Sequence, residues 1–111
     1  MNIPNKIKVA GYEYTIERPS EPFASGTQVC DGIHKFSEQI IKIARAGNEV
    51  YQNTVFLHEL VHAIISSYCS NISEEINEQF TEQFSKGLYQ VITDNPEIFY
   101  LSKKSKITIK E

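Results

Sequence analysis

The chain has 111 residues, of which 41% are hydrophobic and 23% are charged, and its formal net charge is −3. One globular domain over residues 1–111 is therefore expected, large enough to bury a single core. The slightly negative charge argues against nucleic acid as the main partner, because phosphate binding requires a basic surface. No apolar run has the length of a membrane span, and the first residues lack the apolar core of a secretory signal. The expected location is the cytoplasm.

Short strands are predicted in the first half of the chain. Four segments are short and β-branched or alternate apolar with polar side chains, as strands do. They are residues 6–9, 12–17, 33–36 and 39–43. Gly11 supplies the turn of a hairpin between the first two strands, and Asp31–Gly32 interrupts the chain before the third. Residues 18–26, with two prolines and two serines, and residues 44–48 are expected loops.

A long helix is predicted over residues 49–67. Asn48 or Asn53 would begin this helix, and the segment contains neither proline nor glycine. Apolar residues surround nearly its whole circumference, a pattern typical of a buried helix.

A second helix is predicted over residues 74–93, with Ser73 as its N-cap and a stop at residues 94–96. Its apolar side chains recur about every four positions and are expected to face the core. They are Ile76, Phe80, Phe84, Leu88, Val91 and Ile92. Gly87 is expected to permit close packing. A short turn or helix over 97–101 and a last strand over 107–109 would follow.

Strands followed by helices indicate an α+β fold, with a small sheet and two helices packed against one of its faces. Within the first helix, His58, Glu59 and His62 form the pattern H-E-x-x-H. Residues four apart share a helix face, so the two imidazoles project side by side and can bind one Zn²⁺. Glu59 would act as a general base toward a metal-activated water. The alternative is a pair of core histidines bonded to the backbone.

A catalytic zinc site has three protein ligands and an open fourth position. Candidates for the third ligand come from the acids of the second helix, which are Glu74, Glu75, Glu78 and Glu82. Glu78 follows His62 by sixteen positions, enough chain to turn back toward the same ion. Glu82, one turn further on, could accept the free N–H of a ligand histidine. Glu75 and Glu82 remain alternatives as the ligand.

The run over residues 76–82 resembles the Asn-Glu-x-x-x-Asp segment of the gluzincins, the thermolysin-like zinc peptidases. The short chain resembles the compact phage and bacterial minigluzincins. This resemblance implies a zincin-like domain in which a short sheet packs on an active-site helix and a glutamate helix. The ligands so implied for one Zn²⁺ are His58, His62 and Glu78. Glu59 would be the general base, and Glu82, where the family has Asp, would orient His58.

The resemblance also implies a zinc metallopeptidase that hydrolyses a peptide or protein substrate. In this family the substrate lies along an edge strand of the sheet, which by analogy would be residues 39–43. The alternative is a zinc-binding regulatory or interaction module with latent or no activity. A third interpretation is a helical interaction protein without a metal. The sequence leaves the oligomeric state and the cleavage site open.

The remaining candidate residues have structural interpretations. Cys30 and Cys69 lack C-x-x-C partners and are expected to be packed in the interior. His34 is expected at the surface or at a sheet edge, outside the H-E-x-x-H motif. The phenols of three tyrosines could donate a hydrogen bond to a developing oxyanion. They are Tyr51, Tyr68 and Tyr89, and the sequence does not distinguish among them.

Overall fold

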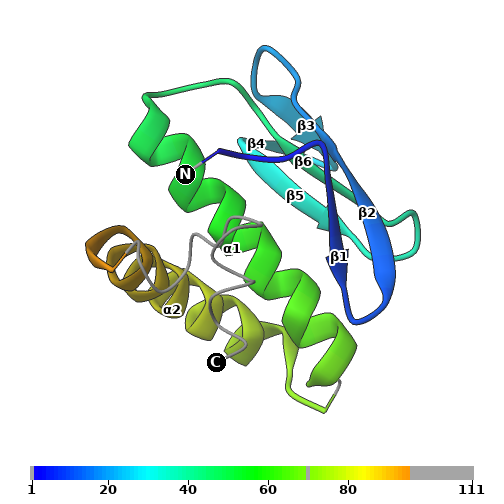
Figure 1. Ribbon diagram of the computed structural model, residues 1–111. Coiled ribbons are helices and arrows are strands. Elements are labelled where there is room, and N and C mark those ends of the chain that lie inside the picture. Colours follow the sequence, from blue (N-terminus) through cyan, green and yellow to red (C-terminus); the bar gives the residue numbers. More distant parts are fainter. Residues whose placement is uncertain (1, 70, 96–111) are drawn as a thin grey trace.

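The computed structural model describes residues 2–69 and 71–95. This part of the chain forms six strands followed by two helices (Figure 1), which confirms the α+β class. The strands are β1 (Lys6–Val9), β2 (Tyr12–Glu17), β3 (Phe23–Ser25), β4 (Gln28–Cys30), β5 (Gly32–Lys35) and β6 (Ile40–Ile43), and the helices are α1 (Glu49–Tyr68) and α2 (Glu74–Asp94). The structures expected over 97–101 and 107–109 lie outside the described residues.

The main sheet has the strand order β1-β2-β6-β5. β1 and β2 form the predicted antiparallel hairpin, and Ala10 and Gly11 take the positive φ angles that a two-residue hairpin turn requires. β6 pairs in parallel with β2 and antiparallel with β5. The prediction of an edge strand over 39–43 is therefore wrong, because β6 lies between β2 and β5. The edge strand next to α1 is β5.

A second hairpin occupies part of the segment predicted to be a loop. β3 and β4 pair antiparallel as a separate two-stranded sheet, with Gly26 in its turn at a φ of 62°. Pro19 and Pro22 both precede β3, so neither removes a backbone donor from the ladder. The loop prediction is correct for residues 18–22 and wrong for residues 23–25.

The two helices are stacked on the sheet in succession. α1 contacts β5, β6 and β1, whereas α2 packs on α1 on the side away from the sheet (Figure 1). The expectation that both helices pack on the sheet is therefore wrong for α2. The Asn48 side chain accepts a hydrogen bond from Tyr51 N at 2.8 Å, and Ser73 Oγ accepts one from Ile76 N at 3.2 Å. Neither described helix is long and apolar enough to cross a bilayer.

The core lies between the sheet and α1. Its buried side chains are Val9, Tyr14, Ile16, Ile41, Ile43, Phe56, Leu57 and Ala63. Elsewhere on α1, Val50 and Ile64 are 56% and 40% exposed. The predicted all-round burial of α1 is therefore wrong at these positions, because the sheet and α2 leave part of the helix uncovered.

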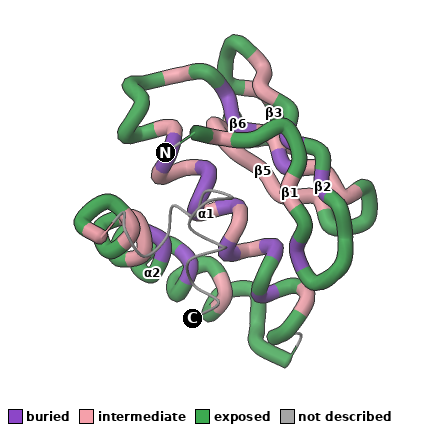
Figure 2. Tube along the Cα trace, viewed as in Figure 1, coloured by how far each residue is buried: buried purple, intermediate pink, exposed green. Residues whose placement is uncertain are grey.

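The apolar residues of α2 do not all face the core as predicted. Leu88 and Ile92 pack against the core cluster, but most of α2 is exposed (Figure 2). The exposed apolar side chains are Ile76, Phe80, Phe84 and Val91. Thr81 and Ser85 are buried instead. Each follows an exposed phenylalanine by one position, so its side chain is rotated about 100° around the helix. A Cβ on Gly87 would meet nothing within 4 Å, so the expected close packing there is absent.

The two cysteines are not interior residues. Cys30 is half-buried at the end of β4, and Cys69, which caps α1, is exposed. Both carry free thiols. The expectation that they pack in the core is wrong, because both stand at element ends beyond the α1–sheet interface.

Candidate metal centre

α1 and α2 bring three predicted side chains to one point. His58 and His62 project from the same face of α1, and their Nε2 atoms are 3.2 Å apart. Glu78 of α2 lies against both rings, with Oε1 3.1 Å from His58 Nε2 and Oε2 3.2 Å from His62 Nε2. Each of the three residues offers one donor atom, and these three atoms lie within 4.8 Å of one another. These three residues could hold a metal ion.

The spacing of the donor atoms fits a small divalent ion. A tetrahedral ion with ligands about 2.0–2.1 Å away holds its donors about 3.3 Å apart, close to the observed 3.2 Å between the imidazole nitrogens. Two imidazoles and a carboxylate also direct lone pairs into one small volume. Without a cation these lone pairs repel one another, whereas a cation between them would attract all three donors.

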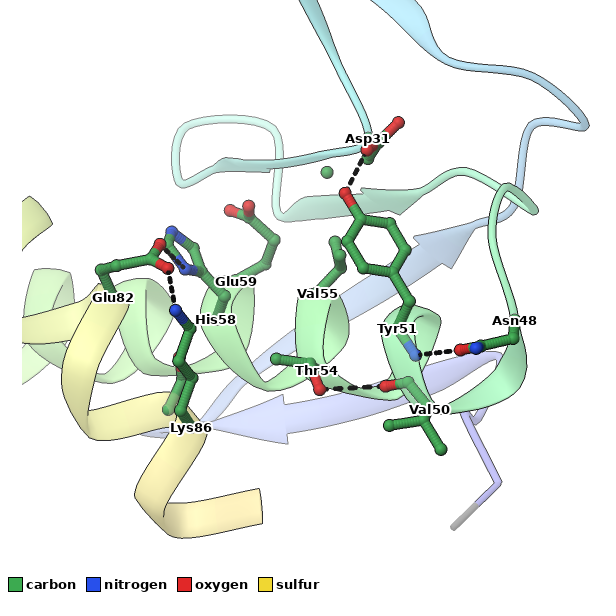
Figure 3. Close-up of a pocket in the computed structure, with 12 residues that line it drawn as sticks. Asp31, Asn48, Val50, Tyr51, Thr54, Val55, His58, Glu59, Glu82 and Lys86 are labelled. Atoms are coloured by element: carbon green, nitrogen blue, oxygen red, sulfur yellow. Dashed lines mark hydrogen bonds and ion pairs between the residues drawn. The ribbon is translucent and has the colours of Figure 1, made fainter. Parts of the chain in front are cut away.

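Of the alternative acids, Glu82 lies on the other nitrogen of His58. Its Oε2 is 3.5 Å from His58 Nδ1, and its Oε1 is 2.9 Å from Lys86 Nζ (Figure 3). The hydrogen bond from Lys86 lowers the pKa of Glu82, so its carboxylate remains ionised and able to accept from the ring. Among the described residues, Glu75 forms no ion pair with either histidine. The geometry therefore favours Glu78 over both rivals as the third donor.

His62 is oriented by a residue to which the sequence analysis gave no role. Its Nδ1 lies 3.0 Å from Asn77 Oδ1, which also accepts a hydrogen bond from Thr81 Oγ1 at 3.0 Å. Because an amide oxygen only accepts, the imidazole proton lies on Nδ1 and the Nε2 lone pair faces Glu78 and His58. Burial lowers the pKa of His62, which favours the neutral ring that a metal requires.

Glu59 lies beside the triad but outside it. Its side chain is only 8% exposed, and Figure 3 shows its carboxylate near His58 and facing away from Lys86. Burial, with a smaller contribution from the negative charge of Glu78, raises the pKa of Glu59 to about 8. A carboxyl group with this pKa can both accept and release a proton near neutral pH.

Gly32 at the start of β5 allows the edge strand to approach Glu59. A Cβ at this position would lie 2.6 Å from Val55 Cγ1 and 3.0 Å from Glu59 Oε2. In the sequence, Gly32 shows only as part of a break before the strand. Its second role depends on the packing of β5 against α1, which the local sequence does not reveal.

Replacing Gly32 with alanine should therefore destabilise the protein by about 1–3 kcal/mol, because Val55 and Glu59 must move to avoid the methyl group. Urea unfolding in the presence of a chelator would measure this loss. Gly87→Ala is the matched control: its methyl group meets no atom, so it should stabilise α2 by up to about 1 kcal/mol. Equal effects of the two substitutions would contradict the proposed close approach.

His34 lies on the edge strand, as expected, but it also lines the cleft that contains the triad. This cleft of about 690 Å³ includes His34, His58, Glu59, His62 and Glu78 in its wall. His34 Nε2 lies 2.9 Å from the hydroxyl of the fully buried Tyr14. Burial, and secondarily the nearby His62, lowers the pKa of His34 to about 4, so the ring is neutral at pH 7.

A second cleft of about 580 Å³ lies on the other side of His58 and Glu59, between the start of α1 and Glu82 (Figure 3). Tyr51 borders it and donates a hydrogen bond to Asp31. Ser85 also lines it, and the buried Ser85 hydroxyl has no hydrogen-bond partner among the described residues. Of the three tyrosines considered for an oxyanion, only Tyr51 borders either described cleft.

Comparison of the chain with protein-family models, with curated proteins and with solved structures gave no match. A functional assignment must therefore come from the residues and their geometry.

Proposed function

We propose that the chain is a zinc-dependent peptide hydrolase with a small zincin-like fold, as the resemblance to minigluzincins implies. The observation that supports this most directly is the convergence of His58, His62 and Glu78 from two helices, with a buried Glu59 beside them. Two imidazoles and one carboxylate are the donor set of many catalytic zinc sites. Calcium and magnesium prefer oxygen donors alone.

The chemistry is divided between the ion and the chain. When bound, Zn²⁺ would supply a Lewis acid and lower the pKa of a water molecule to about 7. Glu59 would accept the proton of that nucleophile and deliver it to the leaving amine. Asn77 and Glu82 would keep the two imidazoles in the orientation that ligation needs.

The substrate would be a peptide in extended conformation. β5 is the edge strand closest to α1, and Gly32, Ile33 and His34 of this strand line the cleft of the triad. A peptide added beside β5 by backbone hydrogen bonds would pass over the triad. In this proposal β5 takes the place of residues 39–43, the strand expected from the sequence.

Two measurements on one preparation test the proposal. The full chain, purified without chelator, should contain about one zinc per molecule, and it should cleave a generic peptide mixture until a chelator is added. Zinc without cleavage would instead favour a zinc-binding regulatory or interaction module. Protein that takes up no zinc, even after incubation with the metal, would contradict both interpretations.

A further inference from the structure

The side chain of His34 projects from the edge strand β5 toward α1. Residues two apart in a strand share a face, so His34 lies on the same face as Gly32, where a Cβ would be 3.0 Å from Glu59 Oε2. His34 is also paired with Ile41 of β6, which belongs to the core between the sheet and α1. The imidazole therefore borders the cleft of the metal triad from the side of the sheet.

The buried Tyr14 determines which nitrogen of His34 carries the proton. The Tyr14 hydroxyl lies 2.9 Å from His34 Nε2, and Tyr14 is fully buried. Burial, with a smaller contribution from Tyr12, raises the pKa of Tyr14, so the phenol keeps its proton. A buried hydroxyl needs an acceptor for this proton, and His34 Nε2 is the only partner of this hydroxyl among the described residues. Nε2 therefore accepts, and the proton of the neutral imidazole lies on Nδ1.

The Nδ1–H group of His34 is a free donor that faces the cleft. Within residues 2–69 and 71–95 no side chain or backbone atom accepts a hydrogen bond from it. It is also not enclosed, because the Ser85 hydroxyl is the only buried side-chain atom without a partner in this part of the chain. Rotation of the ring would leave the Tyr14 hydroxyl unpaired. The donor is therefore held in place before any ligand binds.

We propose that His34 donates a hydrogen bond from Nδ1 to the carbonyl oxygen of the peptide bond that is cleaved, an inference that rests on the proposed function. A peptide paired with β5 would pass this donor. Negative charge develops on the carbonyl oxygen in the transition state, so a fixed N–H group stabilises the transition state more than the bound substrate. The proton stays on Nδ1 throughout. Tyr14 is a positioning residue, because it acts through the ring of His34.

The tyrosine that borders the other cleft is less suited to this role. The Tyr51 hydroxyl already donates its single proton to Asp31. A carbonyl oxygen could be bound by Tyr51 only after this hydrogen bond is broken. His34 requires no such exchange.

The proton position can be measured without any catalysis. Nitrogen–proton NMR correlation of the imidazoles in the full chain at pH 7 should show His34 protonated on Nδ1. Tyr14→Phe removes the group that fixes this tautomer, so the Nε2–H form should become populated. Tyr12→Phe is the matched control on the same strand, since Tyr12 is 43% exposed, and it should leave the tautomer unchanged. A parent protein with the His34 proton on Nε2 would overturn the inference.

Kinetics of the zinc-loaded protein test the donor itself. His34→Phe keeps a planar ring but has no N–H group, and it should lower kcat by about 10²- to 10³-fold, the usual loss for one such donor. KM and zinc content should not change. His34→Asn, whose amide nitrogen can replace Nδ1 as a donor, should recover part of the rate. Tyr14→Phe should lower kcat in the parent but not in the H34F background, because it acts through the imidazole. Should H34F alone not fold with the Tyr14 hydroxyl unpaired, the Y14F/H34F double variant, which lacks this hydroxyl, should show the same loss relative to Y14F/H34N.

The outcomes separate this inference from the proposed function. If the parent cleaves peptides and H34F cleaves them equally fast, the inference is wrong and the proposed function stands. An H34F variant with a raised KM and an unchanged kcat would assign His34 to substrate binding alone, and one without zinc would make His34 a metal ligand. Either result overturns the inference. A parent that cleaves no peptide contradicts the proposed function, and the role of His34 then fails with it even if the proton lies on Nδ1.

Discussion

Replacing Glu59 with glutamine should lower the rate of peptide hydrolysis by about 10²- to 10⁴-fold, the usual contribution of a positioned general base. Glutamine has nearly the same size but cannot accept the proton. Zinc binding should be retained, because Glu59 is not among the three converging donors. The measurements are kcat on a peptide identified in the mixture and the zinc content of the same sample.

Glu49→Gln provides the control for this change. Glu49 is an exposed residue in the first turn of the same helix, so the substitution is chemically identical but distant from the triad. It should leave kcat unchanged. An E59Q variant that cleaves as fast as the parent would show that Glu59 is not the base. An E59Q variant that no longer binds zinc would show that Glu59 has a ligand role that the structure does not assign.

The parts of the site that follow from helix geometry could be predicted from the sequence. Within one helix, a spacing of four fixes which side chains share a face, so the pairing of His58 with His62 required no tertiary information. The same rule relates Glu78 to Glu82. The two pairs can meet only if α2 returns along α1. The short connection between the helices favours this return, and the structure brings the two pairs together.

The parts that depend on long-range pairing could not be predicted. β6 follows β5 in the chain yet lies inside the sheet, because it pairs with the distant β2 as well. No local pattern distinguishes an internal from an edge strand when both are four residues long. The roles of Gly32 and His34 follow from the contact of β5 with α1 and were missed for the same reason.

The error on α2 has a different origin. The sequence predicts its most apolar residues in the core, because apolar periodicity usually marks the buried face. In the structure, Asn77 and Thr81 face α1 and connect to His62, so the inner face is partly polar. The stacked Phe80 and Phe84 are thereby turned outward. A helix that carries polar site residues on the face toward its neighbour cannot bury its whole apolar stripe there.

The metal-free protein should lose stability as the pH rises toward 8, because of Glu59. The pKa of this carboxyl is about 8 in the folded chain, against an ordinary value of 4.5. Below pH 4.5 the group is protonated in both the folded and the unfolded state, and its contribution to the free energy of unfolding is fully present. Between pH 4.5 and 8 the unfolded chain releases the proton while the folded chain retains it, so unfolding becomes progressively easier. The difference between the two pKa values corresponds to about 5 kcal/mol.

His34 changes the stability in the opposite direction with pH, so its effect must be separated from that of Glu59. Its pKa is about 4 in the folded chain and 6.5 ordinarily, so its contribution is present above pH 6.5 and is lost as the pH falls toward 4. The buried His62, whose pKa is also lowered, behaves in the same way. The parent should therefore be most stable near pH 6 and should weaken most clearly above pH 6.5.

Comparison with E59Q isolates the carboxyl group, because both histidines titrate in both proteins. The free energy of unfolding, measured in urea with a chelator, should favour E59Q over the parent increasingly as the pH rises from 4.5 to 8. Adding zinc should reduce this trend, since a cation beside Glu59 stabilises its charged form. A difference between the two proteins that is the same at pH 4.5 and pH 8 would show that the Glu59 carboxyl is not held neutral by its burial between β5 and the triad.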